Sequence, residues 1–182
     1  MNNQTLKIAT RSNISPFFAM EVMRDANERQ AAGEDILHLE VGEPCFGAPK
    51  EVITSAQHLL NQGHLGYTEA LGLPAFRQAI SAHYKSNYGV GISADRVVAT
   101  FGASGAFLLA FLASFDVGDR VAIIEPGYPA YRNILQALGI EVVPIRPAPS
   151  SKFHKVIELL QQNYPLQGLI IASPANLSLI HI

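Results

Sequence analysis

The sequence has few of the features that mark secreted, membrane-spanning or nucleic-acid-binding proteins. Its 182 residues include one cysteine, Cys45, so no disulfide can form within the chain, which suits a reducing compartment. The formal net charge is -2 and no basic run is present, which argues against nucleic acid as the main partner. No apolar run is long enough to span a bilayer, and the first residues lack the apolar core of a signal peptide. These absences predict a soluble, cytoplasmic protein with neither nucleic acid nor membrane as a partner.

Metal ligands are also sparse in the sequence. None of the six histidines lies four residues from another, which is the spacing of a helical metal site, and no carboxylate ligand motif surrounds them. Cys45 has no histidine or asparagine context near it, so we interpret it as a packing residue rather than a nucleophile. No metal site is predicted.

The composition and the order of predicted elements indicate a globular α/β protein. Hydrophobic residues make up 48% of the chain, and its length allows one domain or one and a half. From residue 95 onward, predicted strands and helices alternate, which is typical of a mainly parallel sheet covered on both faces. The predicted strands are 36–41, 97–101, a strand ending at Glu125, 140–145 and 168–173; the predicted helices are 16–32, 49–63, 74–88, 107–115, 131–138 and one from Ser150 or Ser151 through Leu160.

The stretch 95–131 organises the rest of the chain. The apolar segment 97–101 predicts a buried strand, and the small residues Gly102 to Ala106 then lead into an apolar helix. A strand that hands over to a helix at small residues leaves unpaired N–H groups and the positive end of the helix dipole together. This arrangement favours phosphate binding, with the Ser104 hydroxyl as a further donor. Alternatively, the small residues simply let the helix pack closely on the sheet.

Two more polar groups are predicted at the carboxyl ends of strands, where ligands bind in sheets of this kind. Tyr128 follows the strand that ends at Glu125, and Asn176 follows the last predicted strand. A phosphate-binding turn, a flat aromatic ring and an amide suit a planar, phosphorylated cofactor. By themselves, Tyr128 is equally well explained as a packing residue and Asn176 as a cap of a turn.

Five motifs occur in the order of a known family. They are Gly42-Glu43-Pro44, Gly66-Tyr67-Thr68 with Gly72 and Phe76-Arg77, Gly102-Ala103-Ser104-Gly105-Ala106, Glu125-Pro126-Gly127-Tyr128-Pro129-Ala130-Tyr131, and Ser173-Pro174-Ala175-Asn176. Together they resemble the N-terminal half of a class I/II aminotransferase, a pyridoxal-phosphate enzyme of the aspartate aminotransferase fold. The resemblance implies a three-layer αβα fold with a mainly parallel sheet. It divides the chain into an N-terminal arm or small-domain segment (1–45), a partial cofactor-binding large domain (46–176) and a tail that does not look native to the fold (177–182).

The resemblance also implies a role for particular residues. Gly102, Ala103 and Ser104 would hold the phosphate of pyridoxal 5'-phosphate, Tyr128 would stack on its ring, and Asn176 would hydrogen-bond its phenolic oxygen. Gly42 would bind the substrate α-carboxylate through its N–H group. Tyr67 would reach the cofactor phosphate of a neighbouring subunit, which implies a homodimer. The substrates would be an amino acid and a 2-oxo acid.

The sequence departs from the family after Asn176. The family continues with Pro-Thr-Gly and later carries the lysine that forms the Schiff base, whereas this chain reads Leu-Ser-Leu-Ile-His-Ile over residues 177–182. Lys152 and Lys155 superficially resemble a Ser-x-Lys signature, but they precede the strand that leads to Asn176 and are interpreted as solvated charges. No catalytic residue is therefore assigned. The expectation is a truncated aminotransferase that is inactive as it stands.

Three other interpretations remain open at this point. The chain is alternatively a non-catalytic fragment that binds the cofactor or dimerises, or another enzyme of the same fold, such as a lyase or decarboxylase. The third alternative is an NAD-binding dehydrogenase, because Gly102–Phe107 partly matches the dinucleotide fingerprint and Glu125 lies near the position of a ribose-binding carboxylate.

Overall fold

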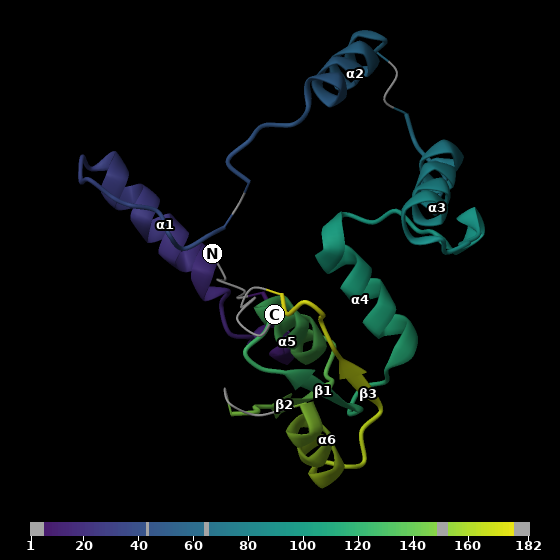
Figure 1. Cartoon of the computed structure of the whole chain (residues 1–182). Helices are drawn as coiled ribbons and strands as arrows, with labels where there is room; N and C mark the ends of the chain where they lie inside the picture. Colours follow the sequence, from purple (N-terminus) through teal and green to yellow (C-terminus); the bar gives the residue numbers. More distant parts are fainter. Residues whose placement is uncertain (1–5, 43, 64–65, 149–152, 177–182) are drawn as a thin grey trace. The chain divides into compact units, whose positions relative to one another are not determined.

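The structure of the protein is a computed structural model that describes residues 6–42, 44–63, 66–148 and 153–176 (Figure 1). The chain forms two compact units, one made of residues 1–25 with 103–182 and the other of residues 26–102. The expectations that concern Glu43, a helix cap at Ser150 or Ser151, Lys152 and the tail at 177–182 lie outside the described residues.

The described elements are mostly helical. They follow in the order η1 (Thr10–Ser12), α1 (Phe18–Ala31), α2 (Lys50–Asn61), α3 (Pro74–Tyr88), η2 (Ala94–Arg96), α4 (Gly102–Ser114), β1 (Arg120–Ile124), α5 (Pro129–Ala137), β2 (Glu141–Ile145), α6 (Phe153–Gln162) and β3 (Gly168–Ile170).

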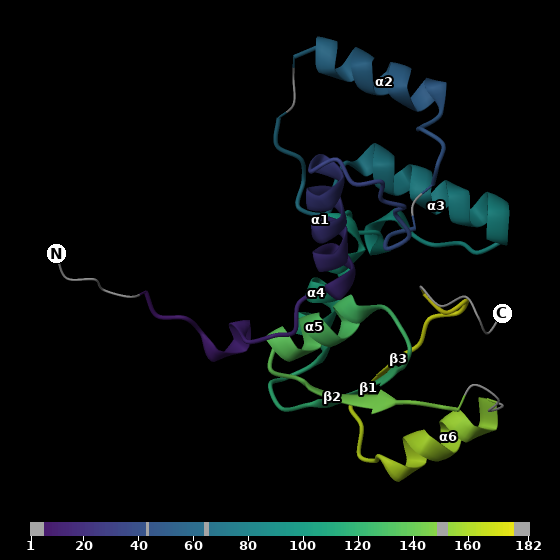
Figure 2. The same ribbon diagram turned by 90° about the vertical axis from the view of Figure 1, so that its left-hand side faces the viewer.

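A parallel sheet forms the centre of the first unit. Its strand order is β2-β1-β3, and β1 pairs in parallel with both neighbours. The central β1 reads Arg-Val-Ala-Ile-Ile, and its middle residues Val121, Ala122 and Ile123 are buried, as expected of a strand covered on both faces. Helices α5 and α6 lie on opposite sides of this sheet (Figures 1 and 2).

Two hydrophobic clusters hold the layers together. On one face, Phe111 of α4 and Leu135 of α5 pack with Val121 and Ile123 of β1. On the other face, Val156, Leu159 and Leu160 of α6 pack against the cluster of Ala122, Val143 and Ile145. The sheet is therefore the middle layer of an αβα arrangement, which confirms the predicted fold class.

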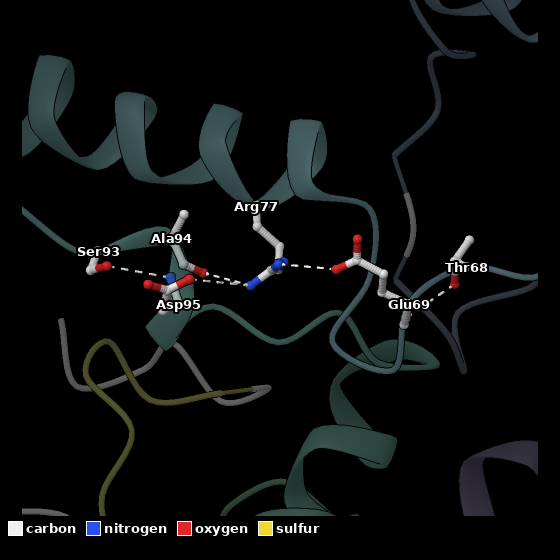
Figure 3. Close-up of polar contacts among 6 residues, drawn as sticks. All are labelled: Thr68, Glu69, Arg77, Ser93, Ala94 and Asp95. Carbon is white, nitrogen blue, oxygen red and sulfur yellow. Dashed lines mark hydrogen bonds and ion pairs between the residues drawn. The ribbon is translucent and has the colours of Figure 1, made fainter.

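In the second unit, a buried arginine connects α3 to the loops on either side of it. Arg77 donates from Nη1 to the carbonyl oxygen of Ala94 at 3.2 Å and from Nη2 to Oε2 of Glu69 at 3.4 Å (Figure 3). The Arg77 residue is 8% exposed. Because these partners precede and follow α3 in the sequence, one guanidinium fixes both connections of the helix.

Two predicted strands do not form. Residues 36–41 have no strand pairing, and Leu37 and Leu39 are exposed. Residues 97–101 are also irregular, and a backbone hydrogen bond from the N–H of Ala99 to the carbonyl oxygen of Leu71 is their link to a neighbouring segment. Both segments have the apolar pattern of a strand. A strand also needs a hydrogen-bonded neighbour, and no described strand lies beside either segment.

Helix α4 begins earlier and β3 ends earlier than predicted. The small residues from Gly102 to Ala106 form the first turn of α4 instead of a loop before it. Gly102 has a φ of 71°, so glycine is the residue that can make this sharp entry without strain. Strand β3 stops at Ile170, which pairs with Ile123 of β1.

Candidate active site

The N-terminus of α4 is open to solvent. Gly102, Ala103 and Ser104 are all exposed, and the first turn carries no acidic residue. A Cβ atom added to Gly102 would meet no atom within 4 Å, so the space in front of the helix is free. The first N–H groups of a helix have no partner within it, and the dipole favours negative charge there. This end of α4 can accept a phosphate group.

Tyr128 lies between the end of β1 and the start of α5. It is the N-cap residue of α5, with Pro129 at the first helical position, and its ring is half-buried. It lines a cavity of about 510 Å³ together with Glu125, Tyr131, Arg132 and Arg146. A planar ligand at this edge of the sheet would therefore meet an aromatic ring and charged groups.

A series of aromatic contacts joins Tyr128 to α4. The Tyr128 and Tyr131 rings are edge to face at 5.4 Å, and the Tyr131 ring contacts Phe107 of α4 in the same way at 4.9 Å. Phe107 is three residues from Ser104, which is about one helical turn. The ring contacts thus connect Tyr128 to α4 about one turn from its N-terminus.

The other predicted site residues have fewer described contacts. Asn176 is exposed in a turn that follows β3, within the same unit as Tyr128 and Ser104. Gly42 and Tyr67 are exposed and belong to the second unit.

Sequence reasoning missed a charged cluster beside Tyr128. Glu125 accepts hydrogen bonds from Nε of Arg146 at 2.9 Å and Nε of Arg132 at 3.1 Å. Both residues follow five-residue strands in the sequence, but only the structure shows that these two strands pair in parallel. Opposite charges after such strands come to lie next to each other.

The residues present fit pyridoxal phosphate in two respects. The open end of α4 supplies N–H donors and a hydroxyl in free space, which matches a phosphate group. Tyr128 supplies a half-buried ring beside a cavity large enough for a small aromatic ligand. Among the described residues, no group of three His, Cys, Asp or Glu side chains is arranged to hold a metal ion. The described helices include none long and apolar enough to cross a membrane.

Comparison with known proteins identifies relatives over most of the chain. Residues 34–177 match the family model described as aminotransferase class I and II. The valine--pyruvate aminotransferase of Mycobacterium tuberculosis is 47% identical over 173 residues, which are 94% of this chain and 45% of the relative. The aspartate aminotransferase of Geobacillus stearothermophilus is 29% identical over 94% of this chain and 44% of its own length.

Solved structures that are similar to this chain include aminotransferases as well. The crystal structure of an aminotransferase from Mycobacterium tuberculosis has a TM-score of 0.87 at 47% identity, over 95% of this chain and 45% of its own. The aspartate aminotransferase of Rhizobium meliloti has a TM-score of 0.82 at 26% identity, over 94% of this chain and 44% of its own. The chain thus spans about half the length of the relatives that it matches.

These findings leave the dehydrogenase alternative without support, because Glu125 is held by two arginines and the matched relatives are aminotransferases. The family match extends from before α2 to beyond β3 and so includes both the open end of α4 and Tyr128. From the sequence match and the fold together, we conclude that this chain belongs to the class I and II aminotransferase family.

Proposed function

We propose that this chain forms the N-terminal half of the pyridoxal-phosphate site of an aminotransferase, which moves an amino group between an amino acid and a 2-oxo acid. The observation that supports the proposal is the series of ring contacts from Tyr128 through Tyr131 to Phe107, about one turn from the open N-terminus of α4. A phosphate and an aromatic ring on one ligand need these two groups at the same place.

Each predicted residue has a defined task in this proposal. The N–H groups of Ala103 and Ser104 and the Ser104 hydroxyl donate hydrogen bonds to the phosphate, and the entry at Gly102 keeps the approach free. The Tyr128 ring stacks on the cofactor and fixes its plane. Once bound, pyridoxal phosphate supplies an electron sink for the substrate carbon that carries the amino group.

Three further residues have roles in this proposal. Asn176 donates from its side-chain amide to the phenolic oxygen of the cofactor ring. Gly42 donates its N–H to the substrate carboxylate, and Tyr67 donates to the cofactor phosphate of a second subunit. This last role makes the proposed assembly a homodimer. The single cysteine, which suits a reducing compartment, supports a cytoplasmic location.

The resemblance to the family assigns proton transfer to a lysine that lies further along the relatives than the matched part. Amino-group transfer is therefore proposed for a complete protein, and this chain contributes the residues that bind the phosphate and the ring. Because the Mycobacterium tuberculosis relative is named for valine and pyruvate, this pair is the first substrate pair to test.

Cofactor binding by the 182-residue chain tests the first part of the proposal. The chain has no tryptophan and six tyrosines, so its intrinsic fluorescence comes from tyrosine and reports on a ligand that stacks on Tyr128. Pyridoxamine 5'-phosphate is the ligand of choice because it has no aldehyde that would react with surface lysines. It should quench the fluorescence, and pyridoxamine without the phosphate should bind far more weakly.

A pair of serine variants locates the phosphate. Ser104 and Ser114 lie at opposite ends of α4 and are both exposed. The variant S104A should weaken binding of pyridoxamine phosphate by about tenfold to 100-fold, the value of one hydrogen bond to a charged group. S114A should leave binding unchanged. Equal affinities of the two variants, or equal binding with and without the phosphate, would show that α4 does not bind the phosphate.

Activity is tested by restoring the missing length. The chain is mixed with a protein that carries the part of the Mycobacterium tuberculosis relative beyond the matched region, and valine and pyruvate are supplied. Formation of alanine that requires both components supports amino-group transfer. Release of carbon dioxide without alanine would favour the decarboxylase alternative instead.

A further inference from the structure

Glu125 and Arg146 occupy equivalent positions after two neighbouring strands. The last register pair of β1 and β2 is Ile124 with Ile145, and the N–H of Glu125 continues the pairing to the carbonyl oxygen of Ile145 at 2.9 Å. The Glu125 carboxylate accepts from Nε of Arg146 through Oε2 at 2.9 Å. The carboxyl ends of both strands are thereby joined by an ion pair.

The second carboxylate oxygen of Glu125 is used differently. Oε1 accepts hydrogen bonds from Nε of Arg132 at 3.1 Å and from its Nη2 atom. Arg132 belongs to the first turns of α5, four residues beyond Tyr128. The side chain of Glu125 is 20% exposed and that of Arg132 is 31% exposed, so water only partly screens the pair. Glu125 thus connects the start of the turn to the helix at its end.

The turn from Glu125 to Tyr128 has little conformational freedom. A Cβ atom on Gly127 would lie 2.7 Å from the carbonyl oxygen of Ile124, so the backbone is tightly folded at this point. Tyr128 follows directly, and its ring contacts Phe17 edge to face at a centroid distance of 6.1 Å. A shift of the turn would move the ring away from Phe17 and from the cavity that it lines.

We propose that Glu125 is a positioning residue for Tyr128: its carboxylate, held by Arg132 and Arg146, fixes the turn so that the Tyr128 ring stacks on the cofactor. The inference rests on the proposed function, since it assigns Glu125 a role at the same site. Glutamine at this position keeps the size of the side chain, but it removes the charge and turns an amide donor toward one of the arginines.

The chain offers a matched control at the other end of the same two strands. Glu141 of β2 accepts from Nε of Arg120 of β1 at 3.0 Å, and these residues form the first register pair. E125Q therefore removes the ion pairs of Glu125 with Arg132 and Arg146, and E141Q removes the pair of Glu141 with Arg120 at the other end of the same two strands. Both variants remain part of the complete 182-residue chain in the test.

Binding of pyridoxamine 5'-phosphate distinguishes positioning from general stabilisation. E125Q should weaken binding by up to about tenfold, because a displaced Tyr128 ring no longer stacks on the cofactor, whereas E141Q should change it by less than about twofold. E125D, which keeps the charge, should recover part of the affinity. Equal effects of E125Q and E141Q would overturn the inference.

A double-mutant cycle with Tyr128→Leu tests whether Glu125 acts through the ring. In the Y128L chain, E125Q should have little further effect on affinity, since the group that it positions is already absent. If E125Q costs the same tenfold in both backgrounds, Glu125 does not act through Tyr128 and the inference fails.

A measurement without cofactor separates this inference from the proposed function. If the wild-type chain binds no pyridoxamine phosphate, the proposed function fails, and the NMR signals of ring-labelled tyrosine still report on the turn. The Tyr128 signals, assigned with Y128F, should show contact with Phe17 in the wild type and E141Q and lose it in E125Q. Unchanged Tyr128 signals in E125Q would overturn the positioning role.

Discussion

Gly72 and Ala99 approach each other so closely that a side chain on Gly72 would collide with Ala99. A Cβ atom built on Gly72 would lie 2.6 Å from the Cβ atom of Ala99, and Gly72 has a φ of 95°. The N–H of Ala99 donates to the carbonyl oxygen of the adjacent Leu71 at 2.9 Å. This approach holds the irregular segment 97–101, which leads into α4, beside the turn that precedes α3.

The variant G72A should destabilise the protein more than a glycine substitution elsewhere. The positive φ costs about 1–2 kcal/mol for any residue with a Cβ, and the collision adds about 1–3 kcal/mol. Gly33 is the control, because its φ is 94° and no atom lies within 4 Å of an added Cβ. Urea unfolding should therefore show a smaller loss for G33A. A second substitution, A99G, should recover part of the loss in G72A, and no recovery would argue against the contact.

The variant R77M should lower the free energy of unfolding by about 1.5–3 kcal/mol, since it removes charged hydrogen-bond donors from a buried site and keeps the apolar stem. Arg96, exposed in η2, is the control, and R96M should change stability by less than about 0.5 kcal/mol. Urea unfolding of the two variants decides the question. Equal losses would mean that the contacts of Arg77 with Ala94 and Glu69 contribute little.

Core packing predicts a contrast between two leucines. Leu135 is fully buried between α5 and β1, so L135A should cost about 2–5 kcal/mol of unfolding free energy. Leu112 of α4 is 59% exposed, and L112A should cost less than about 1 kcal/mol. Thermal and urea unfolding measure both. A large loss of unfolding free energy in L112A would mean that this face of α4 is buried in solution, although Leu112 is exposed in the structure.

Arg29 lowers the pKa of Glu34. Its Nε donates to Oε2 of Glu34 at 2.8 Å, and this hydrogen bond is the main cause of the lowered pKa, followed by desolvation, which opposes it. Because the pKa of Glu34 is lower in the folded state, its contribution to stability is present above the unfolded pKa of about 4.3. The contribution is lost as the pH falls through the lower folded value.

An NMR titration of the glutamates measures this effect. R29M should raise the pKa of Glu34 toward that of an ordinary glutamate, because the donor is lost. R24M, on the same helix, should leave the pKa of Glu34 unchanged, since Arg24 pairs with Glu21 and Asp25. If the pKa of Glu34 does not move in R29M, the ion pair is not formed in solution.

Much of the local structure could be predicted from the sequence. Proline at the start and glycine at the end placed α3, whose first residue is Pro74 and whose C-cap is Gly89 in the left-handed conformation. A strand ending at Glu125 was also predicted, and β1 ends one residue before it, at Ile124. The apolar run after the small residues predicted the helix that is α4, and phosphate binding at its N-terminus stays a prediction. These features depend on neighbours in the sequence.

The tertiary structure decided which of these elements pair and which charges meet. Residues 97–101 have the composition of a strand but form none, because strand formation requires hydrogen bonds to another strand. Glu125 meets Arg146 only because β1 and β2 lie side by side in parallel and in register, which no local pattern specifies. The sequence by itself thus determined the helices, the buried strand and the family, whereas contacts between distant segments determined how Tyr128 is held.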